Sequence, residues 1–108
     1  MKKPITFEPA ERPKTFEEVK AAGQRAADLL GSPQFNLAYR ALLRDLQEQS
    51  ASTAPEARNE RQWYYDQMYA LGAVVTRLGA YFREAEALDE SVIQAEREGA
   101  QAQQAQLQ

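Results

Sequence analysis

The feature that most constrains the fold is a regular stripe of apolar residues between positions 64 and 85. Steps of four and three alternate along it, which is the spacing of one face of a long α-helix. Its members are Tyr64, Met68, Leu71, Val75, Leu78, Phe82 and Ala85. A stripe of this length predicts a helix that buries one side against other helices, so we expect an all-α protein.

The same segment carries a second apolar stripe, which makes its apolar surface too wide for one neighbouring helix. On a helical wheel the second stripe lies roughly 100° from the first, and the combined apolar arc is about 160° wide. The second stripe consists of Trp63, Ala70, Val74, Tyr81 and Leu88. Either a further helix of the chain, or a second copy of the chain, or both must cover the remainder.

Capping residues place two shorter helices before the long one. Thr15 with Glu18 three residues later fits a capping box, and Gly31 is well placed to end that helix. Ser32 fits the N-cap of a second helix with Pro33 in its first turn, where a missing N–H costs nothing. We expect these helices over about 16–30 and 33–49.

The long helix follows a short loop of Ser, Ala, Thr and Pro. Thr53 with Glu56 offers another capping box, so we expect the third helix over about 54–95. The three helices form a helical domain over residues 15–98. Its fold is either a helical hairpin or a small three-helix bundle with one long C-terminal helix.

Both ends of the chain differ in composition from the helices. Prolines recur through residues 1–14 and favour an extended N-terminal arm. Ile5 and Phe7 in this arm are either anchors that dock on a neighbouring surface or chance apolar residues of a disordered segment. Residues 99–108 are almost entirely Ala and Gln, so we expect a flexible, disordered tail.

Composition excludes most catalytic templates. The chain has no Cys and no His, which removes disulfides, thiolate nucleophiles, zinc-finger sites and the commonest general base. Acidic residues gather between Glu84 and Glu90, but they point to different sides of the predicted helix. The isolated glycines form no phosphate-binding loop. We therefore expect no enzymatic activity, no cofactor and no bound metal.

Charge and hydropathy bear on location and on nucleic-acid partners. No apolar run approaches the roughly 20 residues of a membrane span and no signal peptide is evident, so we expect a cytoplasmic protein without a membrane partner. The net charge is −3. Acidic residues are interleaved with the arginines that the second and third helices would bring together, so we do not expect nucleic acid as a partner. These arginines are Arg40, Arg44, Arg58 and Arg61.

Two features of the long helix indicate contact surfaces. Leu71-Gly72-Ala73 recurs as Leu78-Gly79-Ala80, and glycine inside a helix costs about 1 kcal/mol relative to alanine. Close approach of another helix would compensate, and an accidental repeat is the alternative. Tyr65 and Tyr69 project away from both stripes, as contact residues would. The predicted interface comprises Trp63, Tyr65, Tyr69, Gly72, Val75, Leu78, Gly79, Phe82 and Leu88.

From Phe35 to Leu88 the chain combines a short Phe/Tyr/Leu helix, a Ser/Thr/Pro loop and a long helix. That helix runs from Trp63-Tyr64-Tyr65 to Tyr81-Phe82-Arg83-Glu84-Ala85-Glu86. This pattern resembles small all-helical proteins encoded among the virion and assembly genes of tailed phages. The resemblance implies an accessory structural or assembly protein that works in repeated copies, in the virion or the host cytoplasm, and it carries over no catalytic residues.

We therefore expect a non-enzymatic structural or assembly-associated phage protein that acts through helix-mediated homo-oligomerisation. Other virion or host proteins are further expected partners. Two alternatives remain open. One is a single-copy binding module, such as an inhibitor or adaptor of a host protein, which would use the aromatic residues from Trp63 to Tyr69. The other is a DNA-packaging or nucleic-acid-binding component.

Overall fold

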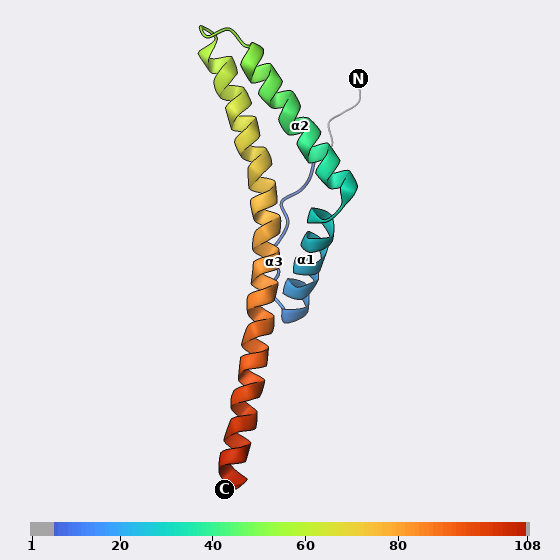
Figure 1. Cartoon of the computed structure of the whole chain (residues 1–108), viewed down its shortest axis with the longest axis vertical. Helices are drawn as coiled ribbons and strands as arrows, with labels where there is room; N and C mark the ends of the chain where they lie inside the picture. The colour runs from blue at the N-terminus through green and yellow to red at the C-terminus, as the bar shows by residue number, and fades with distance from the viewer. Residues whose placement is uncertain (1–5, 108) are drawn as a thin grey trace.

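The computed structural model describes residues 6–107 of the chain. Within these residues it contains three helices, α1 (Phe16–Leu30), α2 (Pro33–Ser52) and α3 (Arg58–Leu107), and no strand (Figure 1). The predicted all-α class with one long C-terminal helix is therefore confirmed. Residues 6–14 lead into α1 without regular secondary structure.

The molecule is elongated because α3 is far longer than the helices that pack on it. α3 has 50 residues, whereas α1 has 15 and α2 has 20. The molecule measures 78 × 31 × 25 Å, and its radius of gyration is 21.7 Å, against about 13 Å for a compact domain of this length. α1 and α2 lie along the first part of α3, and its C-terminal end extends alone (Figure 1).

The start of α1 agrees with the predicted cap. Thr15 Oγ1 accepts a hydrogen bond from the Glu18 N–H at 3.1 Å, and the Glu18 carboxylate accepts one from the Lys14 N–H at 2.9 Å. The glutamate thus reaches one residue beyond the usual capping-box partner. Gly31 ends the helix with φ of −87°, a conformation open to any residue. The stop comes instead from Pro33, which disfavours helical backbone at Ser32.

The turn between α1 and α2 is held by two polar side chains. Ser32 Oγ accepts from the Phe35 N–H at 3.3 Å, which satisfies a free donor at the start of α2. Asn36 Nδ2 donates to the carbonyl oxygens of Leu30 at 2.7 Å and Ser32 at 2.9 Å. The Asn36 side chain therefore ties the end of α1 to the start of α2.

The start of the long helix differs from the prediction. Thr53 ends α2 and does not begin α3, because its Oγ1 donates to the Gln49 carbonyl at 2.7 Å and its N–H to the Ser50 carbonyl at 3.3 Å. α2 therefore runs to Ser52, and α3 begins only at Arg58. A threonine hydroxyl can accept at a helix start or donate at a helix end, and the spacing to Glu56 does not distinguish the two.

α3 also continues through residues 99–107, where the composition predicts a flexible tail. The helix runs unbroken to Leu107, because Ala and Gln are good helix formers and no proline interrupts them. Every residue from Glu90 to Leu107 is exposed. Helical structure in this segment therefore rests on intrinsic propensity and not on packing.

α1 crosses α3 where both helices carry small residues. Gly23 and Ala26 of α1 and Ala85 of α3 are buried at the crossing. A Cβ atom added at Gly23 would overlap the Ala85 side chain and lie 3.0 Å from the carbonyl oxygen of Tyr81. Gly23 therefore lets the two backbones approach closely, and this approach offsets its poor helix propensity.

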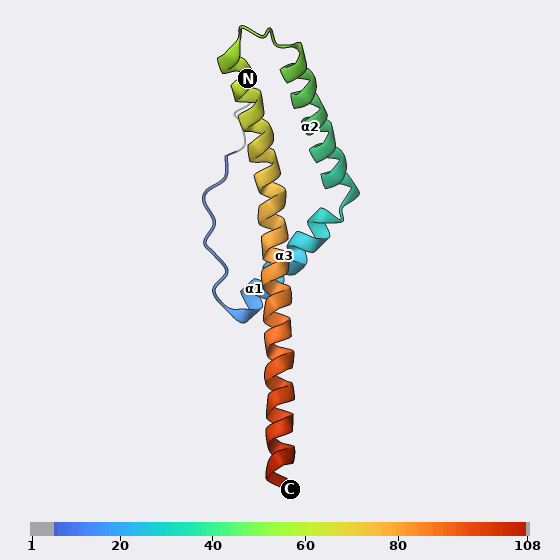
Figure 2. The ribbon, with the colours of Figure 1, turned by 60° about the vertical axis from the view of Figure 1, so that its left-hand side comes forward.

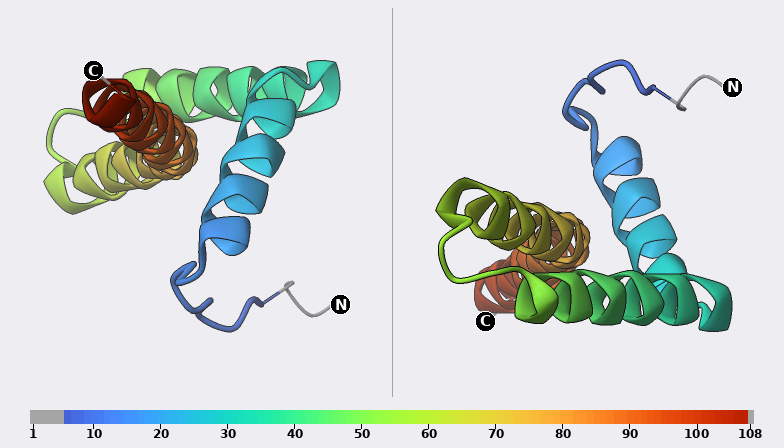
Figure 3. Two further views of the ribbon diagram at one scale, coloured as in Figure 1. Left: turned by 90° about the horizontal axis from the view of Figure 1, so that it is seen from below. Right: turned by 90° about the horizontal axis from the view of Figure 1, so that it is seen from above.

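α2 packs antiparallel to the first part of α3 and then diverges from it toward α1 (Figure 1). The half-buried Tyr64, Met68, Leu71 and Val75 of α3 share the face that α2 approaches. When the molecule is viewed along the axis of α3, this helix lies in the angle between α1 and α2 (Figure 3). The two shorter helices thus cover neighbouring sides of α3 and leave the outer side open.

The interior is small for a chain of this size. Among residues 6–107, the only buried apolar residues are Ala26 and Ala85, and no large side chain is fully buried. The chain exposes 9469 Å² of surface and has a mass of 12.2 kDa, for which a compact monomer would expose about 6,100 Å². The excess reflects the elongated shape, and large apolar side chains such as Phe7, Leu37 and Tyr69 are among the exposed residues.

Replacing Gly23 by Ala should destabilise the protein, although alanine is the better helix former. The added methyl group must push α1 away from α3 at Ala85, and overpacking of this kind costs about 1–3 kcal/mol, which exceeds the gain of about 1 kcal/mol in helix propensity. Urea denaturation followed by circular dichroism measures the change.

Gly99→Ala is the matched control for Gly23→Ala. A Cβ atom at Gly99 meets no described atom within 4 Å, so this variant should gain helicity without loss of stability. Adding Ala85→Gly to Gly23→Ala should recover part of the lost stability by making room for the methyl group. Equal behaviour of the Gly23 and Gly99 variants would contradict the close α1–α3 contact.

Candidate functional site

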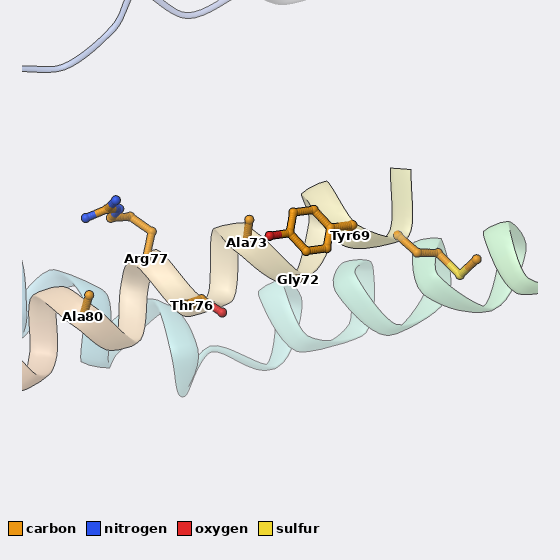
Figure 4. A pocket seen from close by; sticks show the side chains of 7 residues that line it. Tyr69, Gly72, Ala73, Thr76, Arg77 and Ala80 are labelled. Atoms are coloured by element: carbon orange, nitrogen blue, oxygen red, sulfur yellow. The ribbon is translucent and has the colours of Figure 1, made fainter. Parts of the chain in front are cut away.

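A shallow apolar groove lies on α3, with a volume of about 530 Å³. Small residues form most of its floor, while Tyr69 and Arg77 are bulky residues along it (Figure 4). We call it the α3 groove. Its lining residues all belong to α3 and are Met68, Tyr69, Gly72, Ala73, Thr76, Arg77 and Ala80.

The helical repeat places these side chains on one face of α3. Residues at steps of three and four from Tyr69 to Ala80 lie on the same side of a helix, and this side is roughly opposite the one on which Ala85 meets α1. In Figure 2, α1 crosses behind α3, with α2 on one side and residues 6–14 on the other, so the near face of α3 is open.

The N-terminal arm borders this open face. Ala10, Arg12 and Pro13 line a shared depression with α3 residues Arg77 and Tyr81, so the last few residues of the arm lie beside the long helix. Of the two predicted anchors, Ile5 lies outside the described residues. Phe7 is 88% exposed and does not dock on α3 within the chain.

Three of the predicted interface residues lie at or beside the groove. Tyr69 lines it and is 83% exposed, with its ring pointing along the helix toward Ala73 (Figure 4). Gly72 forms part of the floor. Tyr65, one turn earlier, is also exposed. Tyr65 and Tyr69 present large aromatic side chains that a partner can reach, as interface contact residues commonly do.

The other predicted interface residues lie on different faces. Val75, Leu78 and Leu88 are half-buried within the chain, and Phe82 is exposed but lies close to the α1 crossing at Gly23. Trp63 is also exposed. It packs edge-on against Tyr64 with ring centroids 5.1 Å apart. The aromatic residues from Trp63 to Tyr69 therefore divide between different faces of α3.

Neither glycine of the Leu-Gly-Ala repeat marks a close backbone approach within the described chain. The nearest atom to a Cβ at Gly72 would be Tyr39 Oη at 4.0 Å, and at Gly79 it would be Nη1 of Arg83 on the same helix at 3.4 Å. The close approach occurs instead at Gly23, which sequence reasoning missed. A usable signal was the grouping of Ala22, Gly23, Ala26 and Ala27 in α1.

Charged residues continue the face of the groove along α3 in both directions. Asp66 precedes Tyr69 and accepts a hydrogen bond from Gln62 Nε2 at 2.9 Å. Arg83 follows Ala80, and its guanidinium lies near Gly79. The groove therefore has a negative charge beyond one end and a positive charge beyond the other.

The arginines considered for nucleic-acid binding form a mixed surface. Arg44 lies 3.6 Å from Asp45 and 4.0 Å from Glu48, and all three side chains are exposed. Arg61 is half-buried, and its Nε is buried without a hydrogen-bond partner in the described part of the chain. Attraction to a polyanion would thus meet acidic neighbours on the same surface.

No group of three or more acidic side chains in residues 6–107 is placed to hold a metal ion. None of the three helices in this range contains an apolar stretch suited to crossing a membrane.

Comparison with protein-family models, with curated proteins and with solved structures gave no match to this chain. The functional assignment therefore depends on the surfaces of the molecule. Of these, the α3 groove unites concavity, apolar character and an exposed aromatic side chain.

Tyr69→Ala should leave the stability of the dilute protein almost unchanged, within about 0.5 kcal/mol, because an exposed side chain has few contacts to lose. Tyr39→Ala is the comparison variant. Tyr39 is half-buried and its ring lies 6.0 Å from that of Phe35, so its loss should cost about 1–2 kcal/mol. Urea denaturation at low protein concentration compares the two, and a larger loss for Tyr69→Ala would contradict the described exposure.

Proposed function

We propose that this protein is a non-enzymatic structural or assembly-associated protein that associates with further copies of itself through α3. The observation that carries the proposal is the mismatch between α3 and the helices that cover it. α1 and α2 pack on neighbouring sides of its first part, and the open side carries an apolar groove. Burial of exposed apolar area is the main driving force for such association.

The chain exposes more surface than a compact monomer of its mass would. The 9469 Å² that the chain exposes exceeds the area of a compact monomer of its mass by roughly 3,000 Å². A standard interface buries only about 800 Å² on each partner. The excess total area, to which the exposed segment from Glu90 to Leu107 contributes, is larger than one such interface needs.

A place among the virion or assembly proteins of a tailed phage is part of this proposal. It is supported by the resemblance of the stretch from Phe35 to Leu88 to small helical proteins of that class. In this setting the protein would act in the virion or in the cytoplasm of the host, and other virion proteins would be its further partners.

The exposed aromatic residues favour a second candidate function. Tyr69 is 83% exposed beside an apolar groove, and Tyr65 is exposed one turn away. Rigid aromatic side chains in such a position are typical of a surface that binds one protein partner. A single-copy inhibitor or adaptor would use this face without self-association.

Sedimentation velocity of the full chain from about 1 to 100 μM tests self-association. We expect a species larger than a monomer whose share rises with concentration, and a melting temperature that rises in parallel because association stabilises the folded chain. A monomer at every concentration, with an unchanging melting temperature, would overturn the proposal. Loss of a single bound protein partner by a Tyr65→Ala/Tyr69→Ala variant whose oligomeric state is unchanged would favour the binding module.

A further inference from the structure

We infer that the occupant of the α3 groove is the same groove of a second copy, packed antiparallel about a twofold axis between residues 74 and 75. This inference rests on the proposed function, since it names the face and the orientation of the self-association. Shape, charge and access each support it, and they are independent properties of the surface.

The shape of the groove complements itself in one antiparallel register. With the axis between residues 74 and 75, Tyr69 of one copy faces Ala80 of the other, and Arg77 faces Gly72. In each of these pairs a bulky side chain meets a small one, as interdigitated helices require. In a parallel pair Tyr69 would face Tyr69 and Arg77 would face Arg77, so bulky residues would collide and the small ones would leave gaps.

Charge favours the same register. In the antiparallel pair Asp66 of one copy faces Arg83 of the other, and this contact occurs twice because of the twofold axis. Further out, Arg58 near the start of α3 approaches Glu90 of the second copy. A parallel pair would instead place each of these charges beside its own kind, which is repulsive.

The groove is also accessible to a second helix. α1 packs on the opposite side of α3, and α2 and the arm flank the groove without contributing lining residues (Figure 2). Gly72 adds no side chain to the groove floor, and the nearest atom to an added Cβ there is Tyr39 Oη of α2 at 4.0 Å. Contact between copies would compensate for the poor helix propensity of this glycine, which no close backbone approach offsets within the described chain.

Cysteine cross-linking tests the orientation, because the natural chain contains no Cys. Gln62→Cys and Ala87→Cys are made as separate single variants and mixed. The two positions are exposed and belong to the same face of α3, and they lie roughly 37 Å apart along one helix. In the inferred pair residue 62 of one copy faces residue 87 of the other, so a short bismaleimide should join the two variants.

Each outcome of the cross-linking bears on the inference. Efficient joining of Cys at 62 to Cys at 87 supports the antiparallel pair. Joining of 62 to 62 and of 87 to 87 would overturn it in favour of a parallel pair. Association by sedimentation with no cross-link of any of these kinds would place the contact on another surface, which overturns this inference and leaves the proposed function standing. A monomer would remove both.

Charge reversal tests the register with a different measurement. Asp66→Arg and Arg83→Asp should each weaken dimerisation by about 5- to 30-fold, because two contacts per dimer change from attraction to repulsion. The double variant should recover most of the affinity. Asp28→Arg on α1 is the control, since Asp28 accepts the same kind of bond from Gln24 at 2.9 Å but lies away from the groove. If the double variant did not recover dimer affinity, this result would contradict the Asp66–Arg83 pairing.

Discussion

The close contact between Gly23 of α1 and Ala85 of α3 determines the rest of the arrangement. Because Gly23 has no side chain, the Ala85 methyl group and the Tyr81 carbonyl oxygen pack directly against its backbone, and α1 is held on one side of α3. Asn36 fixes the turn that follows, so α2 must cover the adjacent side. The opposite face of α3 receives neither helix, and its small residues remain as an open groove. The surface that we propose for self-association is thus a consequence of where α1 packs.

Local rules in the sequence were sufficient for the all-α class and for the first two helix starts. Thr15 and Ser32 cap their helices because their hydroxyl oxygens accept hydrogen bonds from backbone N–H groups that have no partner within the helix. The same reasoning failed at Thr53, where a carbonyl of the preceding helix competed for the hydroxyl. It also failed at residues 99–107, where low complexity concealed good helix propensity.

The candidate site was predictable only in part. The exposure of Tyr65 and Tyr69 follows from their position outside both apolar stripes, which periodicity alone determines. The importance of Gly23 does not follow in this way, because a glycine that weakens a helix and a glycine that admits a neighbour look the same in a sequence. Which partner lies opposite it is a property of the tertiary fold. For the same reason the sequence could not assign Val75 and Leu78 to internal packing.

The free end of α3 has a consequence for thermal unfolding. From Glu90 to Leu107 no residue is buried, so this segment behaves as an isolated helix that frays from its end and is not linked to the α1–α3 crossing. Its ellipticity should decline gradually on warming, while the crossing should melt in one transition. The heat absorbed in that transition therefore reports on fewer residues than the helical content at low temperature indicates.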